Sequence, residues 1–341
     1  MASAPIDLDD RPDRDRGPNH HGGDDQGGSS DNPKVSRADA IFKRLTQAAG
    51  VGLLLLIVAI ALFLVLKATD ALSANKGDFL TTFEWTPNNV PPVFGIAALL
   101  FGTIITAVIA MIMAVPVAVG IALYLTHYAP KQLATPMSYL VDLLAAVPSV
   151  VYGLWGLYVL VPHALKFQEF LNVHLGWIPL FSAAGGTVGR SVLVASILLG
   201  IMILPIVASI SREIFVQVPT MHKEAALALG ATRWEMIRTA VLPYSKPGII
   251  SASMLGLGRA MGETIAVAIV LPATFGISGH ILEPAGNTIA ANVANAFGEA
   301  TTIGRGALIA SGLVLFIVTM LVNIAARTII ARRKEFSGAS G

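Results

Sequence analysis

Six long apolar stretches constrain the fold of this chain more than any other feature. They lie at about residues 48–66, 94–125, 139–161, 191–210, 249–271 and 307–324. A helix needs ~20 residues to cross the hydrocarbon core of a bilayer, and these stretches are close to that length or longer. They lack the alternating pattern of barrel strands, so helices are the expected spans. The sequence predicts an all-α membrane protein with six transmembrane helices.

The distribution of charge excludes a soluble enzyme. Only 13% of the 341 residues are charged and 54% are hydrophobic, whereas soluble domains carry about 25% charged residues. Fourteen of the 44 charged side chains lie within residues 1–40, so about one residue in ten is charged in the remainder. The basic residues are scattered between apolar runs, which argues against nucleic-acid binding. There is no cysteine, and disulfides, thiol chemistry and cysteine-ligated metals are therefore excluded.

The segments outside the core are expected to differ in character. Residues 1–40 are rich in Asp, Gly, Pro and Ser, which predicts a disordered polar tail. Residues 41–93 are expected to hold the first transmembrane helix and an external loop, and residues 334–341 a C-terminal tail. A cleaved secretory signal is the competing interpretation of the first apolar stretch. The preceding polar stretch is too long, and the apolar run too extended, for a signal.

The basic residues predict the orientation in the membrane. Six spans place both termini on one side, together with the second-to-third and fourth-to-fifth connections. The opposite side carries Lys76, Lys166 and Arg190, with Lys67 and Arg305 at span ends. The first side is far more basic and carries Lys34, Arg37, Lys43, Arg44, Lys131, Arg212, Lys223, Arg233, Arg238, Lys246, Arg332, Arg333 and Lys334. By the positive-inside rule, both termini are predicted to be cytoplasmic, in a multi-pass protein of the plasma (inner) membrane.

The longest predicted cytoplasmic connection has the pattern of a helical hairpin. Pro219 suits a first helical turn, and Gly230 suits a residue that ends a helix in the left-handed conformation. Thr232 followed by Glu235 is a capping-box pattern for a second short helix. A hairpin outside the membrane is expected. From these residues alone, an amphipathic hairpin on the membrane surface is an equally good interpretation.

The spacing within residues 219–243 resembles the EAA loop of bacterial ABC importer permeases. The matching residues are Glu224, Ala225, Ala226, Gly230, Leu242 and Pro243. One position departs, because Ala240 stands where that family commonly has Ile. The resemblance implies that the hairpin, between the fourth and fifth spans, is a coupling helix that docks into a groove on a separate ATP-binding subunit. Small residues allow the close approach, and Glu224 offers a charge for orientation.

Two further stretches resemble the permeases of phosphate-specific ABC importers. Residues 143–156 are similar to the third-span segment, more of the PstC type than of the PstA type, and residues 256–264 are similar to the fifth-span signature. The resemblance extends over about residues 94–333 and implies the type I ABC importer permease fold. It also implies a PstA-like permease, a PstB-like ATPase dimer, a PstS-like phosphate-binding protein and surrounding lipid as partners.

The resemblance implies a transport subunit and not an enzyme. The sequence has no Walker A pattern, so ATP hydrolysis is expected in the partner ATPase. No catalytic residue, metal or cofactor is expected in this chain. The expected function is alternating access for phosphate, driven by ATP. Another oxyanion such as sulfate or molybdate is an open alternative. An ion-coupled secondary transporter is another, although its inverted repeats are not evident.

Arg259 and Glu263 are the candidate residues of the substrate path. They lie four residues apart in an apolar stretch, which places them on one face if the helix is continuous. Burial of two charges is costly, so they are expected to face the bundle interior and to pair. A structural ion pair is one interpretation. The other is that Arg259 meets an oxyanion on the translocation path, with Glu263 compensating its charge.

Weaker candidates surround this pair. Ser149 and Tyr152 follow Pro148 in the third stretch and could line a gate at a proline kink, although ordinary packing explains them equally well. Asp142 is expected to cap or pair locally. The Gly258 and Gly262 spacing favours close helix packing over a nucleotide fingerprint. The polar residues before the last span are expected to face the delivery protein or solvent; these are Asn287, Thr288, Asn292 and Asn295.

Overall fold

A computed structural model describes residues 37–183 and 188–337 of the chain. The chain divides into two units, Met1–Leu56 and Ile57–Gly341. In the first unit the described residues form the N-terminal part of helix α1, Arg37–Ala74. Four residues of the predicted tail, 37–40, therefore belong to a helix. The predicted disorder of residues 1–36 lies outside the described residues.

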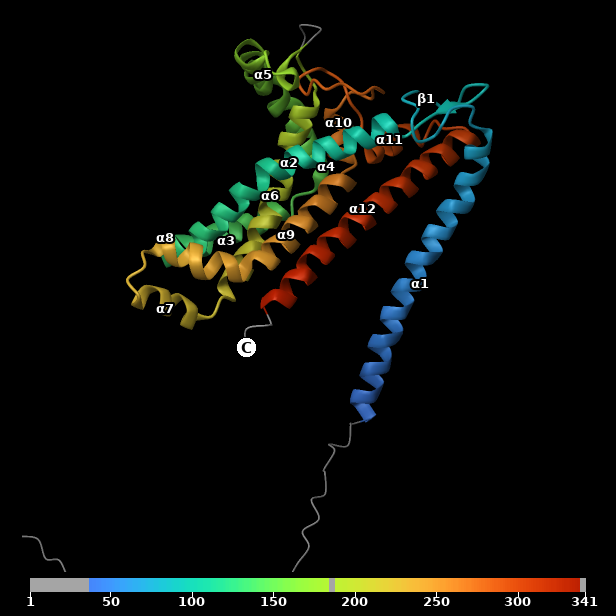
Figure 1. Ribbon diagram of the computed structural model, residues 1–341. Helices are drawn as coiled ribbons and strands as arrows, with labels where there is room; N and C mark the ends of the chain where they lie inside the picture. Colours follow the sequence, from blue (N-terminus) through green and yellow to red (C-terminus); the bar gives the residue numbers. More distant parts are fainter. Residues whose placement is uncertain (1–36, 184–187, 338–341) are drawn as a thin grey trace, which may run out of the picture. The chain divides into compact units, whose positions relative to one another are not determined.

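Helices make up almost all of the second unit (Figure 1). After α1 they are α2 (Ala97–Leu123), α3 (Lys131–Ala145), α4 (Ser149–Trp155), α5 (Val161–Leu175), α6 (Val192–Val216), α7 (Thr220–Ala228), α8 (Arg233–Met236), α9 (Leu242–Gly262), α10 (Ile265–Val270), α11 (Ile289–Ala296) and α12 (Thr302–Ser337). Short π-helical turns η1 (Tyr124–Tyr128), η2 (Gly156–Leu160) and η4 (Ile237–Val241) and a 3₁₀ turn η3 (Pro179–Phe181) connect some of them.

One small antiparallel hairpin is paired in the loop after α1. Its strands are β1 (Trp85–Thr86) and β2 (Val93–Phe94), with Trp85 opposite Phe94. The Trp85 ring also stacks on Phe275 at a centroid distance of 6.2 Å. This loop is thereby fixed to the segment between α10 and α11.

Within the described ranges, five helical segments are long and apolar enough to cross a membrane. They are Asp39–Ala74, Ala97–Tyr128, Ser149–Leu175, Val192–Val216 and Thr302–Thr328. The fifth predicted span, 249–271, is absent from this group because its helix is interrupted after Gly262. The last helix continues to Ser337, so residues 334–337 of the predicted C-terminal tail are helical.

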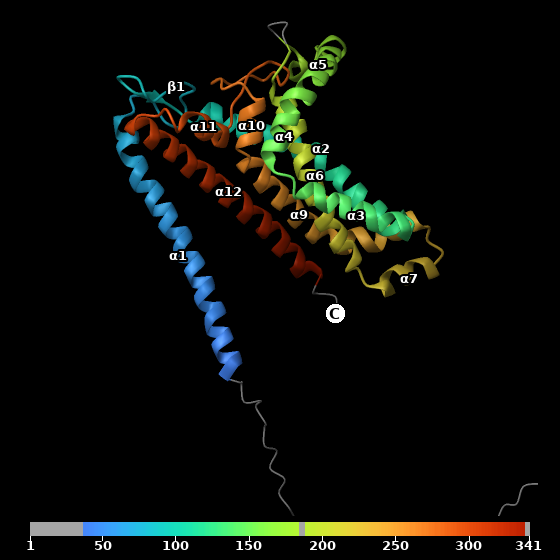
Figure 2. The ribbon, with the colours of Figure 1, turned by 180° about the vertical axis from the view of Figure 1, so that it is seen from behind.

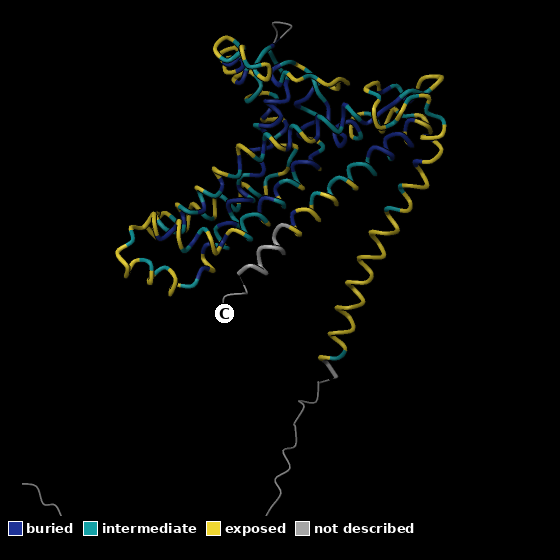
Figure 3. The backbone as a smooth tube through the Cα atoms, viewed as in Figure 1, coloured by how far each residue is buried: buried dark blue, intermediate teal, exposed yellow. Residues whose placement is uncertain are grey.

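The centre of the second unit is built by α2 and α6, which pack along each other (Figures 1 and 2). Small residues recur on one face of α2, and their side chains are buried: Ala107, Ala110, Ala114, Ala118 and Ala122. Gly200 of α6 lies opposite, and a Cβ built there would lie 3.5 Å from the Ala110 carbonyl oxygen. Small side chains of this kind let two helix backbones approach closely. Figure 3 shows the buried residues gathered in this region.

The third predicted span, 139–161, is wrong as one continuous helix. Helix α3 ends at Ala145 and α4 begins at Ser149, with Pro148 in an extended conformation between them (φ −59°, ψ 141°). Proline lacks an N–H and disfavours helical geometry in the residue before it. The long apolar helix therefore starts at Ser149 and continues through η2 and α5 to Leu175.

The fifth predicted span breaks in a similar way. Helix α9 ends at Gly262, Glu263 is extended (φ −68°, ψ 124°), and α10 starts at Ile265. Helices α4 and α10, which follow the two breaks, pack against each other. A Cβ built on Gly153 of α4 would lie 2.9 Å from the Ala266 Cα of α10. Only glycine fits at this contact, so α4 and α10 form one closely packed pair.

Candidate functional site

The two helix breaks lie on the same cavity, which we call the break cavity. Its volume is about 470 Å³. One side is lined by the segment between α3 and α4, residues 145–149, and the other by the end of α9. From α9 it receives Gly258, Arg259, Gly262 and Glu263. The sequence-predicted residues Arg259, Glu263 and Ser149 are therefore brought together.

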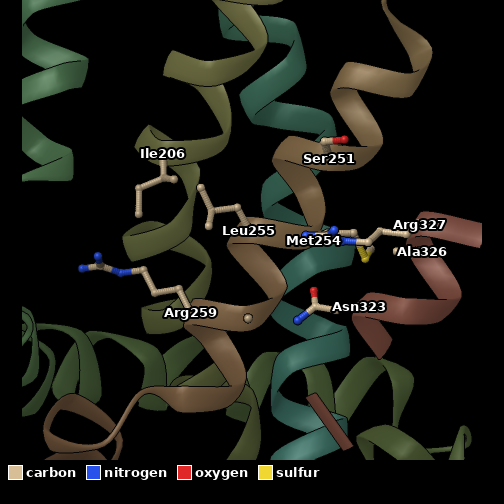
Figure 4. A pocket seen from close by; sticks show the side chains of 9 residues that line it. Ile206, Ser251, Met254, Leu255, Arg259, Asn323, Ala326 and Arg327 are labelled. Carbon is tan, nitrogen blue, oxygen red and sulfur yellow. The ribbon is translucent and has the colours of Figure 1, made fainter. Parts of the chain in front are cut away.

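Arg259 lies in the last turn of α9 with part of its guanidinium group unsatisfied. Its Nε is buried and has no hydrogen-bond partner among the described residues. A buried donor without a partner is costly. Arg259 also borders a second cavity of about 580 Å³ between α9 and α12. Figure 4 shows this cavity, with the Arg259 side chain extending away from Asn323 and Arg327.

The predicted pairing of Arg259 with Glu263 is wrong in this structure. The two ion pairs found among the described residues both involve Arg212. The spacing argument assumed a continuous helix, but the chain leaves the helix at Glu263. The Glu263 side chain instead turns toward α10, where its Oε1 accepts a hydrogen bond of 3.3 Å from the Ala266 N–H. Glu263 is 8% exposed and caps the N-terminus of α10.

The predicted packing role of Gly258 and Gly262 is also wrong within this chain. A Cβ added at either position would meet no atom within 4 Å. Both glycines line the break cavity. Close contacts of this helix with α6 are made instead by Gly256, where a Cβ would lie 2.9 Å from Val207 Cγ2, and by Gly248, where it would lie 2.7 Å from Ile214 Cδ1. The open glycines leave the α9 backbone accessible beside Arg259.

Ser149 and Tyr152 line two different cavities. Ser149, the first residue of α4, borders the break cavity, where the positive end of the helix dipole faces inward. Tyr152 lines a neighbouring, mainly apolar cavity of about 240 Å³. Its hydroxyl donates a 3.0 Å hydrogen bond to the Leu144 carbonyl at the end of α3. Tyr152 thus ties α4 back across the proline break.

Asp142 connects helices rather than pairing locally, so that prediction is wrong. Its Oδ1 accepts a 2.6 Å hydrogen bond from Ser209 and its Oδ2 lies 3.3 Å from Arg212 Nη2. Both partners belong to α6, about 70 residues further along the chain. Arg212 also pairs with Glu213 at 2.8 Å. This cluster holds α3 against α6.

The segment 219–243 contains two short helices joined by a tight turn. Helix α7 is followed by Gly230 with a left-handed backbone (φ +83°). The Gly230 N–H donates to Leu227 and the Ala231 N–H to Ala226, which is the Schellman pattern of a helix end. At α8, the Thr232 hydroxyl accepts from the Glu235 N–H, and the Glu235 carboxylate accepts from the Thr232 N–H. The bonds that the Glu235 carboxylate accepts from the Thr232 N–H and hydroxyl lower its pKa because they favour its charged form.

The residues of the EAA pattern divide between two faces of this segment. Ala226 and Leu242 pack on a core cluster that includes Phe215, Ile237 and Val241, which fixes the segment to α2 and α6. Glu224, Ala225 and Gly230 are exposed, and so is Pro243 at the start of α9. Sequence reasoning missed four large exposed apolar side chains on the same segment, Met221, Leu227, Leu229 and Trp234. Leu229 is 89% exposed. Its position next to the turn residue Gly230 is the sequence feature that could have indicated an exposed apolar side chain.

Three of the four polar residues before the last span are buried, and the fourth, Asn295, is exposed as predicted. Thr288 caps the N-terminus of α11, and Asn287, Thr288 and Asn292 are each at most 3% exposed. The α11 backbone is held by Thr103 of α2, whose hydroxyl accepts a 3.0 Å hydrogen bond from the Ile289 N–H. The prediction of a surface for the delivery protein or solvent is wrong for these three residues, because they face the protein core. Asn295, the fourth residue of that group, lies near the end of α11.

Within the described residues, no group of three His, Asp or Glu side chains could hold a metal ion. The chain combines membrane-length helices with two helix breaks that share a cavity and with an exposed helical hairpin. These are the features of a membrane transport component.

Comparisons with known proteins give the family. The model of the family "binding-protein-dependent transport system inner membrane component" matches residues 114–335. A phosphate transport system permease protein, PstC 2 of Mycobacterium tuberculosis, is 46% identical over 297 residues, which are 86% of this chain and 92% of that protein. PstC of Xylella fastidiosa is 45% identical over 305 residues, covering 88% and 93%. PstC of Haemophilus influenzae is 38% identical over 307 residues, covering 88% and 95%.

A solved structure shows the same fold. It is a bacterial ABC transporter involved in import of the acidic polysaccharide alginate, and one of its chains aligns with a TM-score of 0.52. The alignment covers 85% of this chain and 99% of that chain at 15% identity. The chain belongs to the binding-protein-dependent transport system inner membrane components, and within them to the PstC-type permeases. It is a multi-pass transport component with the type I ABC importer permease fold, not an enzyme.

Proposed function

We propose that this chain is the PstC-like permease subunit of an ATP-driven phosphate importer. It forms half of the translocation path, and a PstA-like permease supplies the other half. A PstB-like ATPase dimer and a PstS-like phosphate-binding protein complete the transporter. The observation that carries the proposal is the break cavity, which is lined by Arg259, a residue whose Nε is buried and has no hydrogen-bond partner among the described residues. The phosphate permeases among the relatives, at 38–46% identity, support phosphate as the anion.

In this proposal, phosphate passes through the break cavity. The Arg259 guanidinium binds it by charge-assisted hydrogen bonds with a bidentate geometry that Lys cannot reproduce. The helix that starts at Ser149 directs the positive end of its dipole to the same place. Gly258 and Gly262 have no side chain to exclude the anion from the α9 backbone. Glu263 lines the same cavity and is held toward α10 by its bond from the Ala266 N–H.

Uptake measurements test this path. Arg259→Lys and Glu263→Gln are compared with wild type in membranes containing the whole transporter, with radiolabelled phosphate and with sulfate as control anion. Arg305→Lys is the matched control, because Arg305 is exposed and lies over the Phe297 ring, away from the cavity. We expect phosphate uptake to fall at least about tenfold in Arg259→Lys, the loss of roughly one strong hydrogen bond. Unchanged uptake in both cavity variants would contradict the path.

The hairpin α7–Gly230–α8 is proposed to couple the permease to the ATPase. Its inner face is fixed on the core through Ala226 and Leu242, while Glu224, Ala225 and Leu229 are exposed for a partner. Closure of the ATPase dimer pushes on the hairpin, and α9 transmits the movement from Leu242 and Pro243 to Arg259. The cavity thereby alternates between the two sides of the membrane.

A substitution at the turn tests the coupling. Gly230→Val places a β-branched residue at a positive φ, which costs at least about 1 kcal/mol and shifts the hairpin. Gly298→Val is the control, since Gly298 is also exposed and open but has no left-handed backbone. We expect Gly230→Val to lose uptake while the chain still enters the membrane. Transport by Gly230→Val at the wild-type rate would contradict the coupling role. In a separate test, failure of any ATPase to co-purify with the wild-type chain would favour a secondary transporter.

The proposed orientation places both termini in the cytoplasm, with residues 1–36 as a tail, 37–93 as the first span and external loop, and 94–333 as the permease core. The sequence has no cysteine, so introduced cysteines are unique in this chain. Gly298→Cys and Leu229→Cys provide exposed positions on the two predicted sides. An impermeant maleimide should label the Gly298→Cys variant in intact cells and the Leu229→Cys variant only after permeabilisation. The reverse pattern would contradict the orientation.

A further inference from the structure

Arg190 makes three hydrogen bonds to the end of α10. Neither the proposed anion path nor the proposed coupling hairpin includes these bonds. Its Nε donates to the Val270 carbonyl at 2.8 Å, and its Nη2 donates to Ile269 at 2.6 Å and to Leu271 at 3.0 Å. These carbonyls end helix α10, where the helix itself supplies no donors. A cation also interacts favourably with the negative end of the helix dipole. Arg190 therefore caps α10 from a segment about 80 residues away in sequence.

The segment that carries Arg190 is itself fixed. Gln168 of α5 is fully buried, donates to the Gly189 carbonyl at 3.0 Å and accepts from the Ser191 hydroxyl at 2.9 Å. Ser191 caps the N-terminus of α6. Both neighbours of Arg190 are thus tied to α5 and α6. Its guanidinium reaches α10 from a rigid position.

Helix α10 does not itself line the break cavity, but it contacts residues on both sides of it. Glu263 caps its N-terminus and lines the cavity, so the same short helix is held by Glu263 at one end and by Arg190 at the other. The contact of Gly153 with Ala266 places α4 against α10, and α4 begins at Ser149 in the cavity. Movement of α10 along its axis would break the bonds of Arg190 and displace both Glu263 and Ser149.

We propose that Arg190 is a positioning residue for the anion path. It holds α10, and through the contacts of α10 it keeps Glu263 and Ser149, which line the break cavity, at a fixed distance from Arg259 on α9. This inference rests on the proposed function of the cavity. Without Arg190, the cavity would bind the anion less tightly during the transport cycle, and fewer phosphate ions would be moved for each ATP hydrolysed. Three of the five guanidinium N–H groups of Arg190 donate to the carbonyls at the end of α10, and Arg190 is not among the residues that line the break cavity.

The test is the number of phosphate ions moved per ATP hydrolysed, measured in proteoliposomes with the complete transporter and its binding protein. The variants are Arg190→Gln, which removes the charge, and Arg190→Lys, which keeps it but cannot reach three carbonyls at once. Lys166→Gln is the matched control, because Lys166 is an exposed basic residue on α5. The amount of assembled complex is measured for each variant.

We expect the ratio to fall about tenfold in Arg190→Gln, to fall less in Arg190→Lys and to stay unchanged in Lys166→Gln. A purely structural role would lower uptake and ATP hydrolysis together, in proportion to the assembled complex. An unchanged ratio in both Arg190 variants, or failure of both to assemble, would overturn the proposal.

The proposed function fails separately. If wild type moves no phosphate, or if Arg259→Lys keeps the wild-type ratio, the anion path itself is wrong. If Arg259→Lys lowers the ratio and the Arg190 variants do not, only the positioning role is wrong.

Discussion

Adding one methyl group at Gly153 should separate α4 from α10 and disturb the break cavity. A Cβ at this position would lie 2.9 Å from the Ala266 Cα and 3.0 Å from the Ile269 Cδ1. Carbon atoms prefer about 3.5–4.0 Å, so the helices must move apart by roughly 0.5 Å or more. The closer contact is to backbone and cannot be relieved by a side-chain rotation. Overpacking of this kind costs about 1–3 kcal/mol.

The same displacement moves Ser149 and Glu263 relative to Arg259. A shift approaching 1 Å at a site that must position a ligand can lower rates by up to about 100-fold. We expect Gly153→Ala to lower phosphate uptake per assembled complex about tenfold. The thermal stability of the purified complex should also fall. Uptake is measured with radiolabelled phosphate, and assembly by size-exclusion chromatography of the labelled chain.

Gly120→Ala is the matched control for this experiment. Gly120 lies in helix α2, is exposed, and a Cβ there would meet no atom within 4 Å. Alanine is a better helix former than glycine by about 1 kcal/mol, so this variant should be neutral or slightly more stable. Equal uptake and stability in Gly153→Ala and Gly120→Ala would refute the close packing of α4 on α10 and its link to the cavity.

Two further predictions concern the pH dependence of the α8 cap and the attachment of helix α11. The bonds from Thr232 lower the folded-state pKa of Glu235. The α8 cap therefore contributes stability at pH values above the ordinary pKa of Glu and loses it as pH falls through the lowered value. The fluorescence of the exposed Trp234 should report this acid transition, and Glu235→Gln, which has a neutral cap, should abolish it. Thr103→Val removes the acceptor of the buried Ile289 N–H and should destabilise the chain by about 1–3 kcal/mol; a thermal transition equal to that of wild type would contradict this.

The apolar stretches were sufficient to locate the first, second, fourth and sixth predicted spans, because hydropathy depends on the local sequence alone. The breaks were harder to predict. Pro148 carried a local signal, and the helix does end there, but the interruption at Glu263 follows from the way its carboxylate caps α10. The spacing of Arg259 and Glu263 predicted a pair because it assumed that the helix continued. Both residues still reach one cavity, since the chain turns at Gly262.

Tertiary contacts account for what the sequence could not predict. The charge pattern of the sequence placed Arg190 only among the basic residues of the external side. Its bonds to α10 join two segments about 80 residues apart, which no local pattern indicates. Asp142 finds its partners on α6, and Asn287 and Asn292 become buried where α11 meets α2. In contrast, the capping box of Thr232 and Glu235 was predictable because it involves only one helical turn.

The most direct test of the central claim is chemical modification of the break cavity during transport. Ala146 lines the cavity and is exposed to it, so Ala146→Cys introduces the only cysteine of this chain into the path. In a transporter whose other subunits lack cysteine, modification of the Ala146→Cys variant with a bulky thiol reagent should stop phosphate uptake, and phosphate should slow the modification. The same reagent on Gly298→Cys should leave uptake unchanged. Full uptake after complete modification of the thiol at position 146, with no protection by phosphate, would contradict passage of phosphate through this cavity.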